Sequence, residues 1–210
     1  MKLARRDVLA AVAALAVAIV CVRLGVWQLD RLGQRRARNA ILAARLALPP
    51  LAVSRTTVPD SAGQRRLIAR GVYDFAGELI GPGRSFDGTP GVALITPLRL
   101  EDGSVVFVDR GWVPSPDARH VDQVLYREPD SATVEGLGVL PPRGWGYPPL
   151  PFILQQSGIA AAQGLPRRWP APALDDGPHL SYAIQWFSFA VIIVVGTGAL
   201  LRKTTVLGPS

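Results

Sequence analysis

The chain has 210 residues, 49% of them hydrophobic, and 23 Lys and Arg against 16 Asp and Glu give it a formal net charge of +7. One cysteine, two histidines and no methionine after Met1 exclude an intrachain disulfide and any thiolate or multi-histidine metal site built by one chain alone. The basic residues flank an apolar run and no nucleic-acid-binding motif is present, which favours anionic lipid over nucleic acid as a partner.

The first predicted element is a membrane anchor. Residues 8–22 contain no charged side chain, and extension to residue 27 gives 20 residues with only Arg23 charged. As a helix, this length crosses about 30 Å of hydrocarbon. We therefore predict a cytoplasmic N-terminus at residues 1–7 and a transmembrane helix at residues 8–27. A signal peptide cleaved after Ala18 is the alternative, but it leaves a short apolar core.

The chain that follows predicts an extension of this helix. Residues 28–48 lack proline and are rich in Ala, Leu and Arg, which indicates a juxtamembrane basic helix that ends at Pro49-Pro50. Its basic face is interpreted as solvated or bound to lipid phosphate.

Residues 49–178 predict an exported β-rich domain, because runs of Val, Ile and aromatic residues are separated by Gly and Pro. The expected antiparallel strands cover residues 67–75, 92–100, 105–112, 132–140 and, more weakly, 152–156. Asp102-Gly103 predicts a hairpin turn, and Pro97 inside a strand run predicts an edge strand or a bulge. Residues 81–91 lack a phosphate-loop signature and predict a mobile or tightly turned connection. Residues 143–151 and 165–178 predict irregular segments.

A second apolar helix closes the chain. Residues 180–201 include no Asp, Glu, Lys or Arg, which predicts a transmembrane helix and a cytoplasmic tail at residues 202–210. Two spans put both ends on one side, and Lys2, Arg5 and Arg6 predict that this side is the cytoplasm. The predicted fold class is therefore an α+β membrane protein, with two transmembrane helices flanking an exported, mainly antiparallel β domain in the plasma (inner) membrane.

The start of the second helix carries a candidate haem site. His179, Tyr182 and Trp186 are spaced i, i+3 and i+7, on one helical face, and Gln185 lies three residues from Tyr182. A histidine with aromatic neighbours at a membrane boundary is typical of an axial haem ligand, but also of an interfacial anchor, which the residue pattern by itself favours. The motif C-x-x-C-H is absent, which excludes covalent c-type haem.

Other chemistry has little support. Ser85, Asp87 and His120 are the available hydrolase triad, without a G-x-S-x-G motif, so no enzyme is predicted. Arg110 follows Asp109 at the end of the strongest strand run. It is a candidate to bind a carboxylate such as a haem propionate, or else it forms a salt bridge while Gly111 allows a turn.

Four stretches resemble a known family, the Surfeit locus protein 1 family of cytochrome oxidase assembly factors. They are LGVWQLDR at residues 24–31, GVYD at residues 71–74, residues 90–114 from Pro-Gly through TPL to VDRGWVP, and HLSYAIQWF at residues 179–187. The stretch 141–178 departs from typical members in being short and rich in proline.

The resemblance implies a non-catalytic assembly factor of an aa3-type haem-copper cytochrome c oxidase. It implies that His179 transiently ligates the iron of haem a, that Tyr182, Gln185 and Trp186 line or support the site, and that subunit I is the partner, with haem a synthase as a further candidate. The alternative is a membrane-anchored scaffold that stabilises an oxidase assembly intermediate without binding haem.

Overall fold

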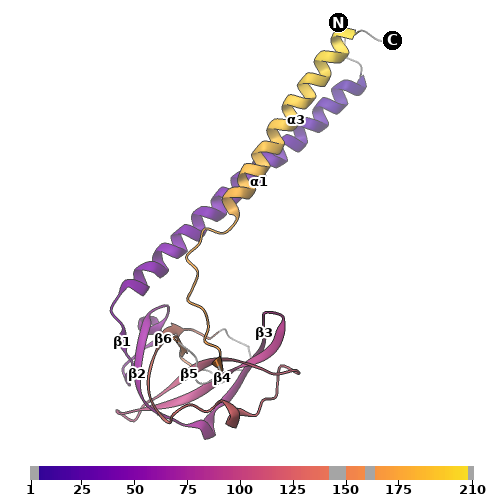
Figure 1. The fold of residues 1–210 in the computed structure, drawn as a ribbon. Helices are drawn as coiled ribbons and strands as arrows, with labels where there is room; N and C mark the ends of the chain where they lie inside the picture. Colours follow the sequence, from indigo (N-terminus) through magenta and orange to yellow (C-terminus); the bar gives the residue numbers. More distant parts are fainter. Residues whose placement is uncertain (1–4, 142–149, 159–163, 208–210) are drawn as a thin grey trace. The chain divides into compact units, whose positions relative to one another are not determined.

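A computed structural model describes residues 5–141, 150–158 and 164–207 (Figure 1). The chain forms two compact units, a helix pair from residues 1–41 and 174–210 and a β domain from residues 42–173. The predicted irregular segment at residues 143–151 lies, up to residue 149, outside the described residues.

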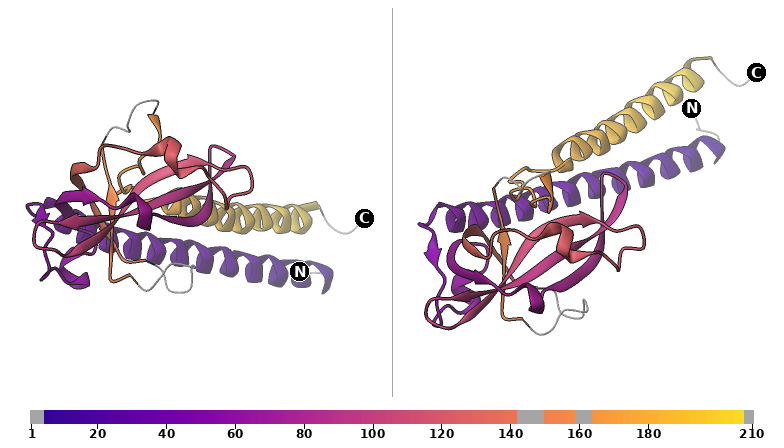
Figure 2. Two further views of the ribbon diagram at one scale, coloured as in Figure 1. Left: turned by 90° about the horizontal axis from the view of Figure 1, so that it is seen from below. Right: turned by 60° about the horizontal axis from the view of Figure 1, so that its bottom comes forward.

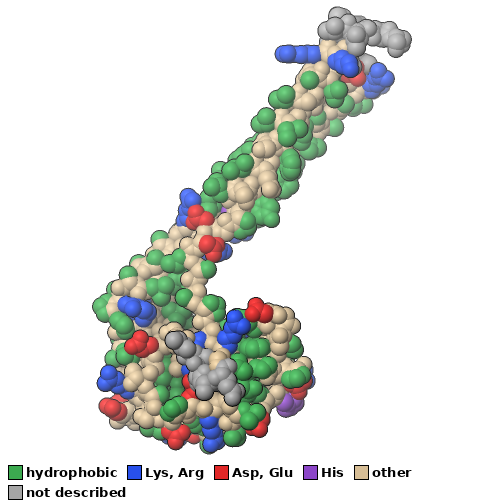
Figure 3. Space-filling model, viewed as in Figure 1, with side chains coloured by type: hydrophobic (Ala, Val, Ile, Leu, Met, Phe, Trp, Pro, Cys, Tyr) green, Lys and Arg blue, Asp and Glu red, His purple; other side chains and the backbone are tan. Residues whose placement is uncertain are grey.

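The helix pair consists of α1, Arg5–Ala47, and α3, His179–Leu207. Both helices are long and apolar enough to cross a membrane. Apolar side chains cover their outer surfaces (Figure 3), and Leu9, Ile192 and Val195 are each more than three-fifths exposed. The predicted continuation of the first helix is confirmed, since α1 runs without interruption to Ala47 and Pro49-Pro50 follows. An apolar exterior of this extent is stable in lipid and costly in water.

The two helices pack through small side chains and run antiparallel, side by side in every view (Figure 2). The buried residues of α1 are Ala18, Cys21, Gly25 and Leu32, whose spacing follows a heptad pattern. A Cβ atom on Gly25 would lie 2.6 Å from the Phe187 ring, so the absence of a side chain there allows the close approach.

The β domain is built on a closed ring of five strands. Each strand of the ring pairs with the next, and β4 pairs back to β2. The ring runs in the order β2 (Arg66–Tyr73), β6 (Ser131–Val139), β7 (Ile153–Gln156), β5 (Val105–Pro114) and β4 (Thr89–Leu100). The pairs are antiparallel except for β5 with β7. The interior is apolar, with Leu67, Leu98, Val108, Val134 and Leu154 fully buried.

Shorter elements surround the ring. Strand β3 (Leu79–Phe86) pairs with β4, and β1 (Leu51–Ala52) pairs parallel with β2. Short helices also occur among the described residues of the domain: the α-helix α2 (Pro59–Ala62) and the 3-10 helices η1 (Phe75–Gly77) and η2 (Gln123–Tyr126).

The five predicted strands are confirmed to within three residues at each end, and the sequence pattern missed β3 and the two-residue β1. The prediction of a turned connection at residues 81–91 is wrong over residues 81–86, the last six residues of β3, and over residues 89–91, the first three of β4. The turn is confined to Asp87 and Gly88, with φ of 49° and 80°. Glycines at 81 and 83 obscure the strand pattern, and the pairing is irregular between Ile80 and Gly83.

Pro97 lies in a central strand, so the prediction of an edge strand or a bulge at this residue is wrong. It pairs with Phe107 on the β5 side of β4. On the other side β4 changes partner, from β3 at Ile95 to β2 at Leu98. The Pro97 carbonyl oxygen faces this junction and accepts the Asp74 N–H at 2.8 Å. The N–H and C=O groups of one strand residue point to the same side of the strand. The N–H that Pro97 lacks would therefore point to the junction between β3 and β2.

The hairpin turn predicted at Asp102-Gly103 is confirmed, with Gly103 at φ of 77°. The Asp102 carboxylate accepts hydrogen bonds from the Ser104 hydroxyl, the Ser104 N–H and the Arg55 N–H. These bonds lower the pKa of Asp102 to about 2, so the turn is held by a carboxylate that stays ionised well into the acid range.

A bulky residue at Gly71 is expected to destabilise the β domain. Its Cβ would overlap the Arg99 carbonyl oxygen of β4, where β2 and β4 close the ring. We expect Gly71→Val to lower the free energy of unfolding by roughly 3 kcal/mol, measured by chemical denaturation of the full chain in detergent. The adjacent Val72 is 51% exposed, and Val72→Ala is the control, with little change expected. Equal stabilities of the two variants would contradict the close approach.

Candidate functional site

His179 is the first residue of α3, and its side chain faces α1. Its Nδ1 lies 2.9 Å from Gln28 Oε1, a contact between residues 151 positions apart in the chain. Gln28 lies between the buried Gly25 and Leu32 along the face of α1 that packs on α3. Both side chains are half-buried. The site therefore combines the first and last stretches that carry the family resemblance.

The segment before α3 is held against α1 by polar contacts. Arg35 donates to the Asp175 carboxylate at 2.8 Å and, with Asn39, to the Asp175 carbonyl oxygen. Arg36 pairs with Asp176 at 2.6 Å, and this guanidinium lowers the pKa of that carboxyl. Part of the basic face of α1 is thus paired within the chain, and these contacts define where α3 begins.

The other predicted haem-site residues on α3 occupy two different positions. Trp186 is half-buried and packs on Ala18, Cys21 and Ala190, with its ring edge-on to Phe189 at 5.9 Å. His179 and Trp186 therefore share the face directed at α1. Tyr182 is 46% exposed and Gln185 is also exposed, so these two point away from α1.

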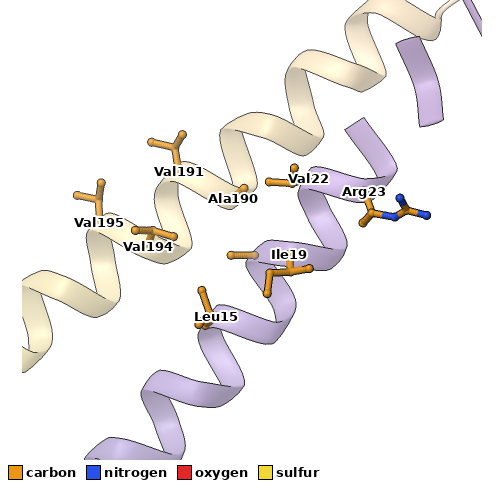
Figure 4. Close-up of a pocket in the computed structure, with 9 residues that line it drawn as sticks. Leu15, Ile19, Val22, Arg23, Ala190, Val191, Val194 and Val195 are labelled. Carbon is orange, nitrogen blue, oxygen red and sulfur yellow. The ribbon is translucent and has the colours of Figure 1, made fainter. Parts of the chain in front are cut away.

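An apolar groove of about 620 Å³ runs between the two helices, further along α3 from His179 (Figure 4). Apart from Arg23, it is lined only by apolar side chains, among them Leu15, Val22, Ala190 and Val194. A surface of this composition suits acyl chains and offers no ligand for a metal.

Arg110 lies inside the β domain, fully buried in an ionic network. Its guanidinium contacts Glu78 at 2.5 Å and Glu128 at 3.1 Å. It also donates to Thr96 Oγ1 at 2.7 Å and to the Tyr126 carbonyl oxygen at 2.6 Å. Two carboxylates thus surround one guanidinium, which is the arrangement a buried cation requires.

A bulge in β5 accounts for this inward orientation. Opposite Leu94 and Ile95 of β4 stand Gly111 and Asp109, which leaves Arg110 as the extra residue. Alternation of side chains between the two faces is therefore broken, and Asp109 and Arg110 are both buried. Gly111, at φ of 124°, provides the backbone conformation for the bulge.

The salt bridge of the alternative for Arg110 is confirmed, but the turn expected at Gly111 is wrong, because Gly111 lies beside a bulge within β5. Arg168 completes the network, with a 2.5 Å contact to Glu128 and a hydrogen bond to the Arg110 carbonyl oxygen. A haem propionate would reach Arg110 only by displacing one of the buried carboxylates, so the geometry gives no support to a propionate site at this residue.

Asp109 is a second buried charged residue of the same strand. Its carboxylate accepts the Trp169 Nε1–H at 2.9 Å and the Gly111 N–H at 3.0 Å. Burial raises the pKa of Asp109, and these two hydrogen bonds only partly oppose that effect.

The residues considered for a hydrolase do not form a triad. His120 Nδ1 contacts Asp117 at 2.5 Å, whereas Asp87 pairs with Arg167 at 3.3 Å. Within the described ranges, no group of three His, Cys, Asp or Glu side chains could hold a metal ion.

Sequence reasoning identified His179 but not its partner. Gln28 lies ten residues after Ala18, in phase with the small residues that pack on α3, and this spacing is the signal that could have revealed it. The pairing of Asp175 and Asp176 with arginines of α1 had no comparable signal, since both aspartates lie in an irregular segment.

Comparison with known proteins agrees with this arrangement. The model of the SURF1 family matches residues 15–191, which include most of α1, the whole β domain and the first thirteen residues of α3. These features define an α+β protein in which the sequence of a small β ring is flanked by two apolar helices. The chain belongs to the SURF1 family.

Three relatives illustrate the extent of the similarity. An uncharacterised SURF1-like protein of Mycobacterium tuberculosis is 25% identical over 205 residues, covering 83% of this chain and 75% of the relative. A SURF1-like protein of Monosiga brevicollis is 29% identical over 228 residues, covering 91% of this chain and 87% of the relative. The cytochrome oxidase assembly protein SHY1 of Saccharomyces cerevisiae is 29% identical over 140 residues, covering 62% of this chain and 36% of the relative.

Removal of the Arg110 charge is expected to destabilise the β domain strongly. Arg110→Met leaves Glu78 and Glu128 buried without their shared cation, a loss of about 3–5 kcal/mol in unfolding free energy. The control is Arg99→Met, which breaks a pair with Asp74 at an arginine whose side chain is 65% exposed and should cost under about 1 kcal/mol. Denaturation of both variants in detergent tests this, and equal losses would rule out a dominant buried network.

Asp109 is expected to make stability fall as the pH rises above about 4. A carboxyl whose pKa is higher in the folded state keeps its proton there more readily than in the unfolded chain. The stability it contributes is therefore present at low pH and lost between its unfolded and folded pKa values. Asp109→Asn should remove this slope, as measured by denaturation monitored through tryptophan fluorescence across the acid to neutral range. If the difference in unfolding free energy between the wild type and Asp109→Asn does not change with pH, the raised pKa of Asp109 is contradicted.

Proposed function

We propose that this chain is a membrane-anchored assembly factor of an aa3-type haem-copper cytochrome c oxidase, which binds haem a through His179 and assists its insertion into subunit I. Membership of the SURF1 family and similarity to a yeast protein named as a cytochrome oxidase assembly protein support the assembly role. The observation that carries the haem part is the contact between His179 and Gln28.

The residues at this site fit one axial ligand for a haem iron. When His179 Nδ1–H donates to the Gln28 amide oxygen, the lone pair of the imidazole resides on Nε2, the nitrogen available to a metal. Trp186 adds aromatic surface two turns along the face of α3 that carries His179, and Tyr182 adds an exposed ring one turn from the histidine. Gln185 adds an exposed amide on the same helix.

Haem a is the cargo in this proposal, and it supplies the iron and the porphyrin that the oxidase needs. The part played by this chain is to hold that cargo through one histidine at the edge of an apolar helix pair. An acceptor that offers two nitrogen ligands in place of one would take the iron in a downhill exchange.

The membrane arrangement is part of the same proposal. The apolar lengths of α1 and α3 support two spans in the plasma membrane, in contact with lipid, with both termini in the cytoplasm. His179 would then lie at the exported boundary, and the β domain would be exported, where it can contact subunit I or haem a synthase.

A scaffold that never binds haem is the second candidate function. It is favoured by the exposed apolar side chains of η2, where Val124 and Leu125 are 63% and 72% exposed on the β domain. Such side chains suit contact with another protein. This scaffold would stabilise an oxidase assembly intermediate through the β domain alone.

The haem-binding function is tested by the visible spectrum of the full chain, purified from cells that also make haem a. We expect haem a absorbance with the wild type and its loss, by at least about tenfold in bound haem, in His179→Ala, because the iron loses its ligand. His120→Ala is the matched control, since His120 is the second histidine and is exposed in the β domain.

A colourless wild type that is still required for oxidase activity would overturn haem binding and leave the scaffold function. Haem that remains bound to His179→Ala at the wild-type level would show that His179 is not the ligand.

A further inference from the structure

We infer that Gln28 is a positioning residue that sets both the orientation and the ligand strength of His179. Its amide oxygen accepts the hydrogen bond of Nδ1–H, leaves Nε2 free and, because an amide is uncharged, keeps the imidazole a moderate ligand suited to release. This inference rests on the proposed function, since it concerns the nitrogen offered to the haem iron.

The position of Gln28 supports this role. It lies on the face of α1 that packs against α3, and the residues before and after it on that face, Gly25 and Leu32, are buried. A polar side chain at such a position stabilises the pair only if it finds a partner, and the Gln28 amide finds His179 at 2.9 Å. The two residues thus form a polar pair within an otherwise apolar contact.

Contacts on both sides hold this pair in register. Toward the N-terminus of α1, the side-chain-free Gly25 lies against the Phe187 ring. Toward its C-terminus, Arg35 and Asn39 hold the Asp175 carbonyl oxygen at 2.7 and 2.8 Å. His179 lies between these two contacts, which together fix the register of its helix turn against Gln28.

The chemistry of the acceptor decides the strength of the ligand. A histidine that donates to a carboxylate gains anionic character and binds metal more tightly, and loss of such a partner costs about 10- to 100-fold in metal affinity. An amide oxygen fixes the tautomer while adding no charge. Gln28 therefore suits a protein that must release its haem, whereas Glu at the same position would retain it.

A purely structural role for Gln28, as a polar contact that fixes helix register, predicts different results. Loss of the contact would then loosen the helix pair but would change neither the tautomer of His179 nor the electronic properties of a bound iron. The discriminating measurements are therefore the protonation of the His179 ring nitrogens and the reduction potential of the haem.

The first test needs no haem. Nitrogen NMR of the full chain in detergent, with labelled histidine, should show His179 neutral with the proton on Nδ1 in the wild type. In Gln28→Leu, it should shift toward the Nε2–H form that free imidazole side chains favour in water. Gln34→Leu is the matched control, because Gln34 lies on the same helix and its amide oxygen accepts a hydrogen bond from the nearby Arg31. An unchanged tautomer in Gln28→Leu would overturn the inference.

The second test loads the same variants with haem a. We expect Gln28→Leu to bind haem about 10- to 100-fold more weakly with a raised reduction potential, and Gln28→Glu to bind it more tightly, release it more slowly and show a lowered potential. Oxidase maturation should fall in both, for opposite reasons. A Gln28→Glu protein with the wild-type potential and release rate would overturn the inference.

Failure of this inference can be told apart from failure of the proposed function. If His179→Ala loses haem while both Gln28 variants behave like Gln34→Leu, haem binding stands and the role of Gln28 is wrong. If the wild type never binds haem a, both are wrong, even where the tautomer depends on Gln28.

Discussion

The close contact between α1 and α3 is the constraint on which the candidate site depends. Apolar helices gain nothing from the hydrophobic effect inside a lipid bilayer, so their association relies on close packing and on polar pairs. Gly25, Ala18 and Ala190 provide the packing, and Gln28 with His179 provides the polar pair. Because α3 follows α1 by more than 130 residues, this contact brings distant parts of the chain into one site.

The β domain is stabilised by a different principle. Its strand ring encloses a small apolar interior. The same domain also contains a buried ionic network in which Arg110 and Arg168 neutralise Glu78 and Glu128. Buried ion pairs of this kind contribute little net stability when complete, but leave an uncompensated charge when broken. The bulge at Arg110 is what turns the guanidinium inward, so the network and the irregularity of β5 depend on each other.

The sequence was sufficient for the helices and for the strands with regular patterns. Apolar length defines α1 and α3, and runs of β-branched residues define β4 and β5, because burial on one or both faces fixes these patterns. Strand β3 was not predicted because glycine and proline occupy its irregular middle. The prediction at Pro97 was wrong because the sequence of one strand does not show where that strand changes its pairing partner. The orientation of Arg110 also depends on a bulge, which adds one residue without any compositional mark.

The candidate site shows the same division between local and distant information. The face of α3 that carries His179 and Trp186 follows from helical spacing, but the partner of His179 depends on the register of a helix that begins 174 positions earlier. A histidine at the end of an apolar helix is compatible with an anchor and with a ligand, and spacing along one helix cannot separate them. The two roles differ in the hydrogen-bond partner of His179 Nδ1. A solvated anchor leaves both ring nitrogens to water, whereas an acceptor supplied by the neighbouring helix selects one nitrogen for the protein and leaves the other for a ligand. The contact to Gln28 therefore gives the two ring nitrogens different surroundings, as the proposed ligand role requires, and an uncharged acceptor suits the reversible binding in that proposal.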